Sequence, residues 1–234
     1  MEYVFRGQDQ VFKRTHFRLP QDSSTVERLG IQVLKGKHER SRIHNLRRHA
    51  AFGVEADLDL GLTPFEELRD EIGIVTAISR GQRIIATIRF VPSGRNMTAA
   101  ERLQSGLITN KTILESNSWE VGRIIMNPED RDPELLPRCL ALALGQLLKR
   151  GQVEYLHATT TMAMARLWRR FAMKIDATVQ GASGERYALI CGHARDVAAA
   201  LNVPVPIQKA PAAPRSLAWN PWPMNQLKPI ATSF

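Results

Sequence analysis

Two opposite charges lie inside a segment that otherwise reads as a buried β-strand. In the stretch SWEVGRIIMNPEDR (118–131), Glu120 and Arg123 stand three residues apart among apolar side chains. A buried charge is costly unless it is paired and hydrogen-bonded. A carboxylate in such a place can take a proton from a nucleophile, and a guanidinium can hold a carboxylate through two parallel hydrogen bonds. The segment therefore predicts either a charged reaction site or a structural ion-pair cluster.

A bulge in this strand would bring the two charges to one face. Side chains alternate along a regular strand, so positions 120 and 123 point to opposite faces. Gly122 stands between them, and a glycine inside a strand often marks a β-bulge, which inserts one residue and shifts the alternation. Arg89 lies in the preceding apolar stretch ATIRFVP (86–92). We therefore predict a partly buried cluster of Arg89, Glu120 and Arg123.

An acidic segment precedes these strands. Residues 53–64, GVEADLDLGLTP, carry Glu55, Asp57 and Asp59. A cluster of two arginines and one glutamate has an excess positive charge, which a carboxylate from this segment would balance. The alternative is that the cluster only ties the acidic segment to the sheet, because a buried ion pair is by itself weak evidence of function.

Composition limits the class of protein. The 234 residues are 44% hydrophobic and 24% charged, which is typical of a folded globular chain. No apolar run is long enough to predict a membrane-spanning helix, and the first residues do not resemble a secretory signal, so a cytoplasmic protein is expected. Cys139 and Cys191 match no metal-binding spacing, and no metal site is predicted. The net charge of +9 predicts an acidic partner.

The elements that must position the charged residues follow from hydrophobic periodicity. Strands are predicted at 30–37, 118–126 and 153–159, hairpins at 71–92 and 175–193, and helices at 38–52, 132–151, 161–174 and 194–201. This order predicts one α/β domain, residues 30–202, with a mixed sheet and one right-handed parallel crossover. An N-terminal arm, residues 1–29, precedes it, and a Pro-rich tail, residues 203–234, follows it.

Three segments carry a resemblance to a known family. ARLWRRFAMKI (165–175) is similar to the late helix of the GNAT acetyltransferase superfamily. ATIRFVP and WEVGRIIM (119–126) resemble the paired strand motifs, an arginine and then Glu-x-x-Arg, of acyl-homoserine-lactone autoinducer synthases and of the related long-chain N-acyl amino acid synthases. The resemblance spans about residues 30–192, most of the chain.

The resemblance implies both a fold and a reaction. The fold is an α/β GNAT-like one, with a mixed, mostly antiparallel central sheet, a splayed and bulged strand, and flanking helices. The reaction moves a fatty acyl group from acyl carrier protein, or from coenzyme A, to the amine of an amino-acid-like acceptor, with no tightly bound cofactor. The matching catalytic residues are Arg89, Glu120 and Arg123. Glu120 is expected to act as the base, and Asp57 or Asp59 to bind the ammonium of the acceptor.

Departures from the family pattern refine this expectation. The glycine-rich pyrophosphate loop is replaced by NPEDRDPELLP (127–137), which argues against the superfamily's usual mode of coenzyme A binding and favours a carrier-protein donor or another binding mode. The tyrosine usual in the late helix is Trp168, whose indole cannot donate a catalytic proton at neutral pH. The spacing of the acidic residues and the missing N-terminal aromatic residues favour an amino-acid acceptor. An autoinducer synthase that uses S-adenosylmethionine is the alternative.

Two further groups of residues have a predicted role beside a structural alternative. Trp119, Met126, Trp168 and Phe171 would contact an acyl chain, or would simply pack in the core. The basic residues Lys149, Arg150, Arg166, Arg169, Arg170 and Lys174 would bind acidic acyl carrier protein, as could Arg40, Arg42, Arg47 and Arg48, or would form a solvated face. His157 is either a base or a structural histidine.

A non-enzymatic function stays open from the charge alone. A basic nucleic-acid-binding protein would explain the net charge, but the chain carries neither a zinc motif nor a clear helix-turn-helix signature, so nucleic acid is not the expected partner. An acyltransferase fold without catalytic activity is the other alternative.

Overall fold

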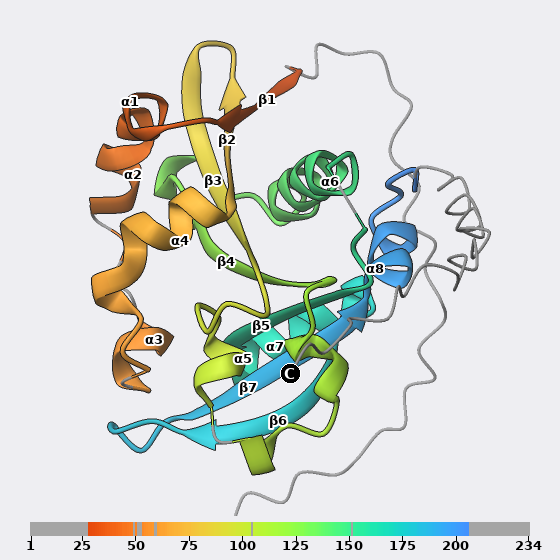
Figure 1. Ribbon diagram of the computed structural model, residues 1–234. Helices are drawn as coiled ribbons and strands as arrows, with labels where there is room; N and C mark the ends of the chain where they lie inside the picture. The colour runs from red at the N-terminus through yellow and green to blue at the C-terminus, as the bar shows by residue number, and fades with distance from the viewer. Residues whose placement is uncertain are drawn as a thin grey trace, which may run out of the picture.

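The computed structural model describes residues 28–48, 50, 53–58, 60–103, 105–150 and 152–205. In these residues seven strands form one sheet in the order β1-β2-β3-β4-β5-β7-β6 (Figure 1). The strands are β1 (Leu29–Leu34), β2 (Ile74–Arg80), β3 (Arg83–Pro92), β4 (Ser118–Met126), β5 (Tyr155–Thr161), β6 (Lys174–Gln180) and β7 (Arg186–His193). Neighbouring strands are antiparallel, except for β4 and β5, which are parallel.

Helices cover both faces of the sheet. They are α1 (Lys37–Arg40), α2 (His44–Arg48), α3 (Val54–Asp57), α4 (Glu66–Ile72), α5 (Ala99–Arg102), α6 (Leu135–Leu148), α7 (Met162–Trp168) and α8 (Ala194–Ala200). Short 3-10 turns are η1 (Ser41–Ile43), η2 (Thr63–Phe65), η3 (Ser105–Leu107), η4 (Lys111–Leu114), η5 (Pro128–Asp130) and η6 (Arg169–Phe171). Figure 1 shows α4 and α6 on opposite sides of the β2–β3 hairpin.

The alternation along β2 separates the two faces. Ile74 and Ile78 belong to the main apolar core, together with the buried residues of α6 and α7. Val75 and Ala77 point the other way and pack with Ile43 near the first helices. Arg89 of β3 is paired with Val75, so it faces the side of α4 rather than the main core. We call these the core face and the charged face of the sheet.

The parallel pair β4–β5 is joined only at its beginning. Ser118, Trp119 and Glu120 pair with residues 155–157, and no further pairing follows although β4 runs on to Met126 and β5 to Thr161. The two strands therefore diverge after Glu120, and backbone groups along their facing edges lose their ladder partners. We call this divergence the split.

A bulge lies on β4 where the split opens. Thr87 pairs with Ile125 and Arg89 with Gly122, so two residues of β4 stand opposite the single residue between Thr87 and Arg89. Arg123 adopts a left-handed backbone with φ of 47° at this point. The bulge was expected around Gly122 and lies at the next residue. The expected mixed, mostly antiparallel sheet with a splayed and bulged strand is confirmed.

Two predicted segments differ from the structure. The single helix expected at 38–52 is broken into α1, η1 and α2. The acidic segment expected as a loop contains α3, and α4 was not expected at all. The side chains that α4 buries are Arg69 and Asp70, so it has no apolar stripe that hydrophobic periodicity could detect.

The terminal regions fall largely outside the described residues. Of the expected arm, residues 28 and 29 are described, and of the expected tail, residues 203–205. Within the described ranges, no helix has both the length and the apolar character that crossing a membrane requires.

The junction of α4 and β2 leaves no room for a side chain. A Cβ on Gly73 would lie 2.4 Å from the carbonyl oxygen of Phe90 and 2.6 Å from that of Arg69. We expect Gly73→Ala to lower the free energy of unfolding by about 1–3 kcal/mol, because backbone must shift to accommodate the methyl group. Urea denaturation measures this.

Gly145 of α6 is the matched control. Its nearest neighbour would be Val203 Cγ1 at 3.8 Å, an ordinary contact. Gly145→Ala should raise the stability by about 0.5–1 kcal/mol through helix propensity. Equal stability of the Gly73→Ala protein and the unmodified protein would show that the junction is not close-packed.

Candidate active site

Glu120 lies at the closed end of the split, and its side chain is 3% exposed. Its Oε1 accepts a hydrogen bond of 2.5 Å from Arg69 Nη2, and its Oε2 accepts one from the backbone N–H of Ala99. Both oxygens of this buried carboxylate are therefore held, one from α4 and the other from α5. An arginine and a backbone N–H thus fix the position of the carboxyl group.

The loop after β3 is shaped to present the Ala99 N–H. Thr98 and Glu101 form a capping box at the start of α5. The Glu101 carboxylate also accepts hydrogen bonds from the backbone N–H groups of residues 94–98. Burial alone would raise the pKa of Glu101, but the hydrogen bonds from Thr98 and from the backbone lower that pKa overall. The charged carboxyl thus organises the turn that holds Glu120.

Arg89 is buried and fully engaged by α4. Its Nη1 and Nη2 donate to the two oxygens of Glu66 at 2.9 and 3.0 Å, and Nη1 also donates to Asp70 Oδ1 at 3.3 Å. This is the bidentate geometry that planar guanidinium and carboxylate groups favour. Arg89 therefore fixes α4 on the charged face.

Glu66 connects Arg89 to the other two arginines of the site. Its oxygens lie 3.2 Å from Arg69 Nη1 and 3.4 Å from Arg123 Nε. The pKa of Arg123 is lowered, and burial is the largest cause. The charges of Arg47 and Arg89 also lower this pKa, whereas Glu66 opposes the shift. Glu120 and Arg123 thus belong to one cluster, in which Glu66 and Arg69 link them.

In the described part of the chain, ion pairs join four arginines and four carboxylates into one cluster. Its members are Arg47, Arg69, Arg89, Arg123, Glu55, Glu66, Asp70 and Glu120, and we call them the charged network. Burial alone would lower the pKa of Arg69, whose side chain is fully buried, but Glu120, Glu55 and Glu66 raise that pKa overall.

A cavity of about 250 Å³ opens beside the network at the split. Glu120, Arg123 and Glu55 line it, together with Ala99 of α5 and Thr159 of β5. Its apolar wall comes from Val54, Val121, Ile124 and Ile125. Thr159 Oγ1 is buried there without a hydrogen-bond partner. The arrangement can hold a small polar molecule against a carboxylate, beside backbone groups that the split has freed.

Asp57 is engaged outside this cavity. Its carboxylate accepts hydrogen bonds from Ser183 N at 2.8 Å and Ser183 Oγ at 2.7 Å, and these bonds lower its pKa. The hydrogen bond with Asp57 raises the pKa of Tyr187 to about 12. Since Glu55 pairs with Arg69, α3 connects the two halves of the sheet across the split. Asp59 lies outside the described residues.

The apolar residues proposed to bind substrate lie on the core face. Trp168 and Phe171 are buried and meet edge to face, with ring centroids 5.8 Å apart. Trp119 and Met126 are half-buried and pack on the same core. None of the four lines the cavity at the split. The indole Nε1 of Trp119 is buried and has no hydrogen-bond partner.

The basic residues proposed to bind carrier protein are all exposed. Lys149 and Arg150 follow α6, while Arg166, Arg169, Arg170 and Lys174 follow one another along α7, η6 and the start of β6. By contrast, two arginines of the first helical segment face α4: Arg47 pairs with Asp70, and Arg40 lies 3.7 Å from Glu71.

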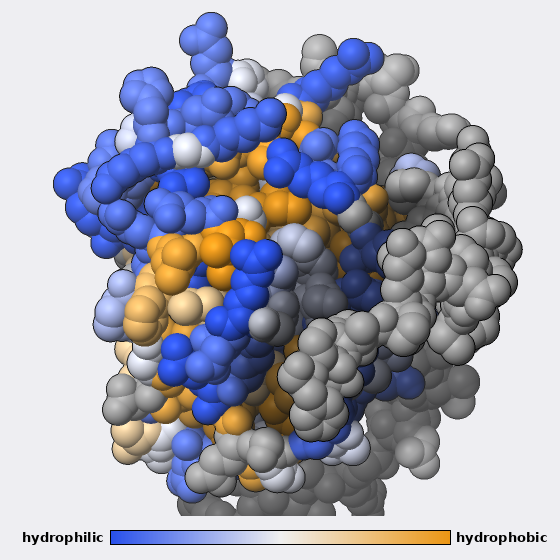
Figure 2. Space-filling model, in the orientation of Figure 1, coloured by the Kyte–Doolittle hydropathy of each residue, from blue (hydrophilic) through white to orange (hydrophobic). Residues whose placement is uncertain are grey.

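Figure 2 shows hydrophilic residues gathered over α1 and α2, and hydrophobic surface between these helices and α6.

His157 is fully buried beside Glu120 in the register of the parallel pair. Its Nε2 lies 2.9 Å from Ser93 Oγ, and its Nδ1 has no partner. Burial lowers the pKa of His157 to about 4, with Glu101 opposing the shift. The ring is therefore neutral at neutral pH and is held in the sheet.

The sequence interpretation missed the residues of α4. Glu66, Arg69 and Asp70 recur at the i, i+3, i+4 spacing of one helix face, and this charged periodicity was the available signal. Of these, Arg69 is the direct partner of Glu120.

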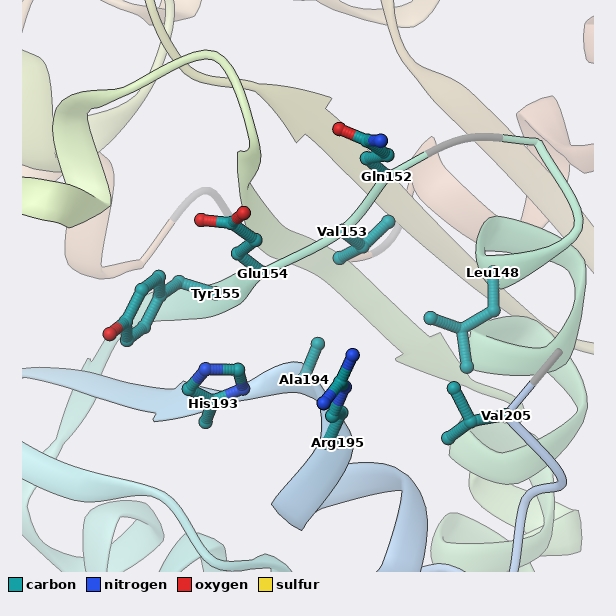
Figure 3. A pocket seen from close by; sticks show the side chains of 9 residues that line it. All are labelled: Leu148, Gln152, Val153, Glu154, Tyr155, His193, Ala194, Arg195 and Val205. Atoms are coloured by element: carbon teal, nitrogen blue, oxygen red, sulfur yellow. The ribbon is translucent and has the colours of Figure 1, made fainter. Parts of the chain in front are cut away.

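A second cavity, of about 330 Å³, lies at the paired end of β5 (Figure 3). Its polar side chains come from Gln152, Glu154, Tyr155, His193 and Arg195, all of them exposed except the half-buried Tyr155. It contains no residue of the charged network, so we place the candidate chemistry in the smaller cavity at the split.

The Arg69–Glu120 pair provides a test of the network. We expect Arg69→Met to lower the free energy of unfolding by about 3–5 kcal/mol, because it leaves the carboxylate of Glu120 buried and unpaired. Adding Glu120→Leu should recover part of this loss, giving a coupling free energy of about 1–3 kcal/mol in a double-mutant cycle.

The exposed pair Lys37–Glu67, at 3.2 Å, is the control cycle. Its coupling should be no more than about 1 kcal/mol, because water screens both charges. Equal coupling in the two cycles would contradict the burial argument.

Known proteins resemble this chain in fold but not in sequence. No protein-family model matches the chain, and no curated protein matches its sequence. The N-acyl amino acid synthase FeeM from uncultured soil microbes superposes with a TM-score of 0.56 at 11% identity, over 75% of this chain and 95% of that one. An uncharacterized protein from Bacillus halodurans gives 0.51 at 10% identity, over 74% of this chain and 88% of that one.

The autoinducer synthase LasI superposes with a TM-score of 0.48 at 13% identity, over 79% of this chain and all of its own. The sheet order, the split after Glu120 and the bulge on β4 agree with the fold that the strand motifs implied. The protein therefore has a GNAT-like fold, which it shares with the N-acyl amino acid synthase FeeM.

Proposed function

We propose that the protein is an N-acyltransferase that moves a fatty acyl group from acyl carrier protein to the amine of an amino-acid-like acceptor. The observation that carries this proposal is the buried carboxylate of Glu120 at the closed end of the split, next to a cavity. The fold is shared with an N-acyl amino acid synthase, which supports the reaction class. The reaction needs no tightly bound cofactor, and a carrier-protein donor places it in the cytoplasm.

The reaction joins an amine to a thioester carbonyl carbon. A C–N bond forms, the C–S bond breaks, and the thiol leaves with a proton. The amine must first lose a proton, and Glu120 is the proposed base, acting directly or through water. Backbone N–H groups that the split leaves without ladder partners are the proposed donors to the thioester oxygen. Arg89 and Arg123 hold the surrounding carboxylates in place, and Glu55 lines the cavity where the acceptor ammonium would lie.

The loop between β4 and α6 favours a carrier protein over coenzyme A. A pyrophosphate site needs backbone N–H groups and positive charge. In residues 127–134, Pro128 and Pro133 lack an N–H, and Glu129, Asp130, Asp132 and Glu134 carry negative charge. The side chain of Asp130 is buried and paired with Arg80 and Arg83 at 3.0 and 2.7 Å, so these two cations are already engaged.

Product analysis tests the proposal. The purified chain is incubated with acyl carrier protein thioesters or acyl-coenzyme A, and with separate pools of amino acids, S-adenosylmethionine and simple amines. Mass spectrometry should show N-acyl amino acids formed from the carrier-protein thioester. An acyl-homoserine lactone would identify the autoinducer synthase instead. Absence of any N-acyl product would overturn the proposal.

Glu120→Gln tests proton removal. It keeps the size and hydrogen-bonding reach of the side chain but removes the charge, so kcat should fall by about 10²- to 10⁴-fold. Thermal melting must accompany the assay, because the change also leaves Arg69 with one carboxylate fewer. Asp57→Asn is the matched carboxylate control. If it abolishes turnover while Glu120→Gln retains it, the assignment of the base to Glu120 is wrong.

Charge reversal on α7 tests the donor surface. Arg166→Glu together with Arg169→Glu should raise KM for the carrier-protein thioester and flatten its dependence on salt, because both side chains are exposed on one helical segment. Arg28→Glu with Lys35→Glu makes the same change of charge at the β1 end of the sheet and should leave KM unchanged. Equal changes in KM from the two pairs of substitutions would show that net charge, rather than a docking surface on α7, determines KM for the carrier-protein thioester.

A further inference from the structure

Six consecutive backbone N–H groups between β3 and α5 all donate to carboxylates. Those of residues 94–98 donate to Glu101 at 2.6–2.9 Å, and the next one, that of Ala99, donates to Glu120. We call residues 94–99 the donor turn. Since the last donor directly follows the five that Glu101 holds, the direction of the Ala99 N–H depends on the path that Glu101 imposes on the turn.

The Glu101 carboxylate is the main attachment of the donor turn. Residues 94–96 are exposed, so apolar packing does not order them. Gly94 and Asn96 have left-handed backbones, with φ of 84° and 56°, and for residues other than glycine this conformation is costly. Such a turn persists only where surrounding interactions fix it. Besides the five N–H groups, Thr98 Oγ1 donates to Glu101 at 2.8 Å, and Arg102 Nε donates to the Asn96 carbonyl at 3.0 Å.

Both ends of the donor turn lie on the strands that form the split. Just before it, the N–H of Ser93 donates to the Ser118 carbonyl of β4 at 2.9 Å, and Ser93 Oγ lies 2.9 Å from His157 Nε2 of β5. At its other end, Ala99 is 1% exposed. The lining of the cavity at the split includes Ala99 and Glu120 but not Glu101. Glu101 can therefore act on the cavity only through the turn.

We propose that Glu101 is a positioning residue for the reaction: its carboxylate fixes the donor turn so that the Ala99 N–H holds Glu120 in the orientation that removes the proton. This inference rests on the proposed N-acyltransferase function, in which Glu120 is the base. Arg69 Nη2 holds the other oxygen of Glu120, so without the Ala99 hydrogen bond the carboxylate would turn about its contact with Arg69. In this scheme Glu101 touches neither substrate.

Glu101→Gln tests the positioning role. It keeps the size of the side chain, but its single amide oxygen replaces the two carboxylate oxygens that hold the turn, and its NH₂ group faces other N–H donors. We expect kcat to fall by about 10- to 100-fold, as for a reacting group displaced by about 1 Å. KM for both substrates should stay unchanged, because Glu101 does not line the cavity.

Asp176→Asn is the matched control. Asp176 of β6 accepts hydrogen bonds from the backbone N–H groups of Thr109 and Asn110 at 3.0 and 2.9 Å, in a turn that does not donate to Glu120. This variant should lower the melting temperature without lowering kcat. An unchanged kcat in Glu101→Gln overturns the proposal, and so does an equal loss of kcat in the two variants.

Thr98 provides a second test if Glu101→Gln does not fold. Thr98→Val keeps the shape of the side chain but removes the hydroxyl that donates to the Glu101 carboxylate and accepts from the Glu101 N–H. It should lower kcat, whereas Thr98→Ser retains the hydroxyl and should retain turnover. Equal turnover of the valine and serine variants would contradict the positioning role of the turn.

A resonance of the free protein separates this inference from the proposed function. In the full chain without substrates, the amide proton of Ala99 should resonate far downfield, because a hydrogen bond to a carboxylate is short and charge-assisted. Glu101→Gln and Glu120→Gln should each move it upfield, and Asp176→Asn should not. A resonance that Glu101→Gln leaves in place overturns the inference even if N-acyl products form. A shifted resonance supports the link from Glu101 to Glu120 even where no N-acyl product forms, so the two proposals can fail separately.

Discussion

The requirement that buried charges neutralise one another determines the structure around the split. Arg69 and Arg89 have fully buried side chains, and each is surrounded by carboxylates. Because isolated charges cannot be left in such an environment, α4 must lie where Glu66 and Asp70 reach Arg89, and α3 must lie where Glu55 reaches Arg69. The helices of the charged face are thus placed by ion pairs, whereas α6 and α7 are placed by apolar packing on the other face.

The same requirement explains why the bulge and the split lie together. A regular β4 would point Arg123 away from Glu120, toward the core face, where its charge would have no partner. The bulge and the left-handed backbone at Arg123 return this side chain to the charged face. A bulged strand bends away from its neighbour, and β4 leaves β5 directly after Glu120. The bulge therefore explains both how two charges three residues apart share one face of β4 and why a cavity opens beside them.

The sequence predicts the parts of the fold that follow apolar periodicity. The strands, α6 and the α7 segment are found close to their expected ranges, because each buries an apolar face. Glu120, Arg89 and Arg123 stand out because charge interrupts that pattern. Helix α4 could not be found in this way, since the face it buries is formed by Arg69 and Asp70. That Arg69, rather than Arg89 or Arg123, contacts Glu120 depends on how α4 folds back onto the sheet, and no local rule contains that information.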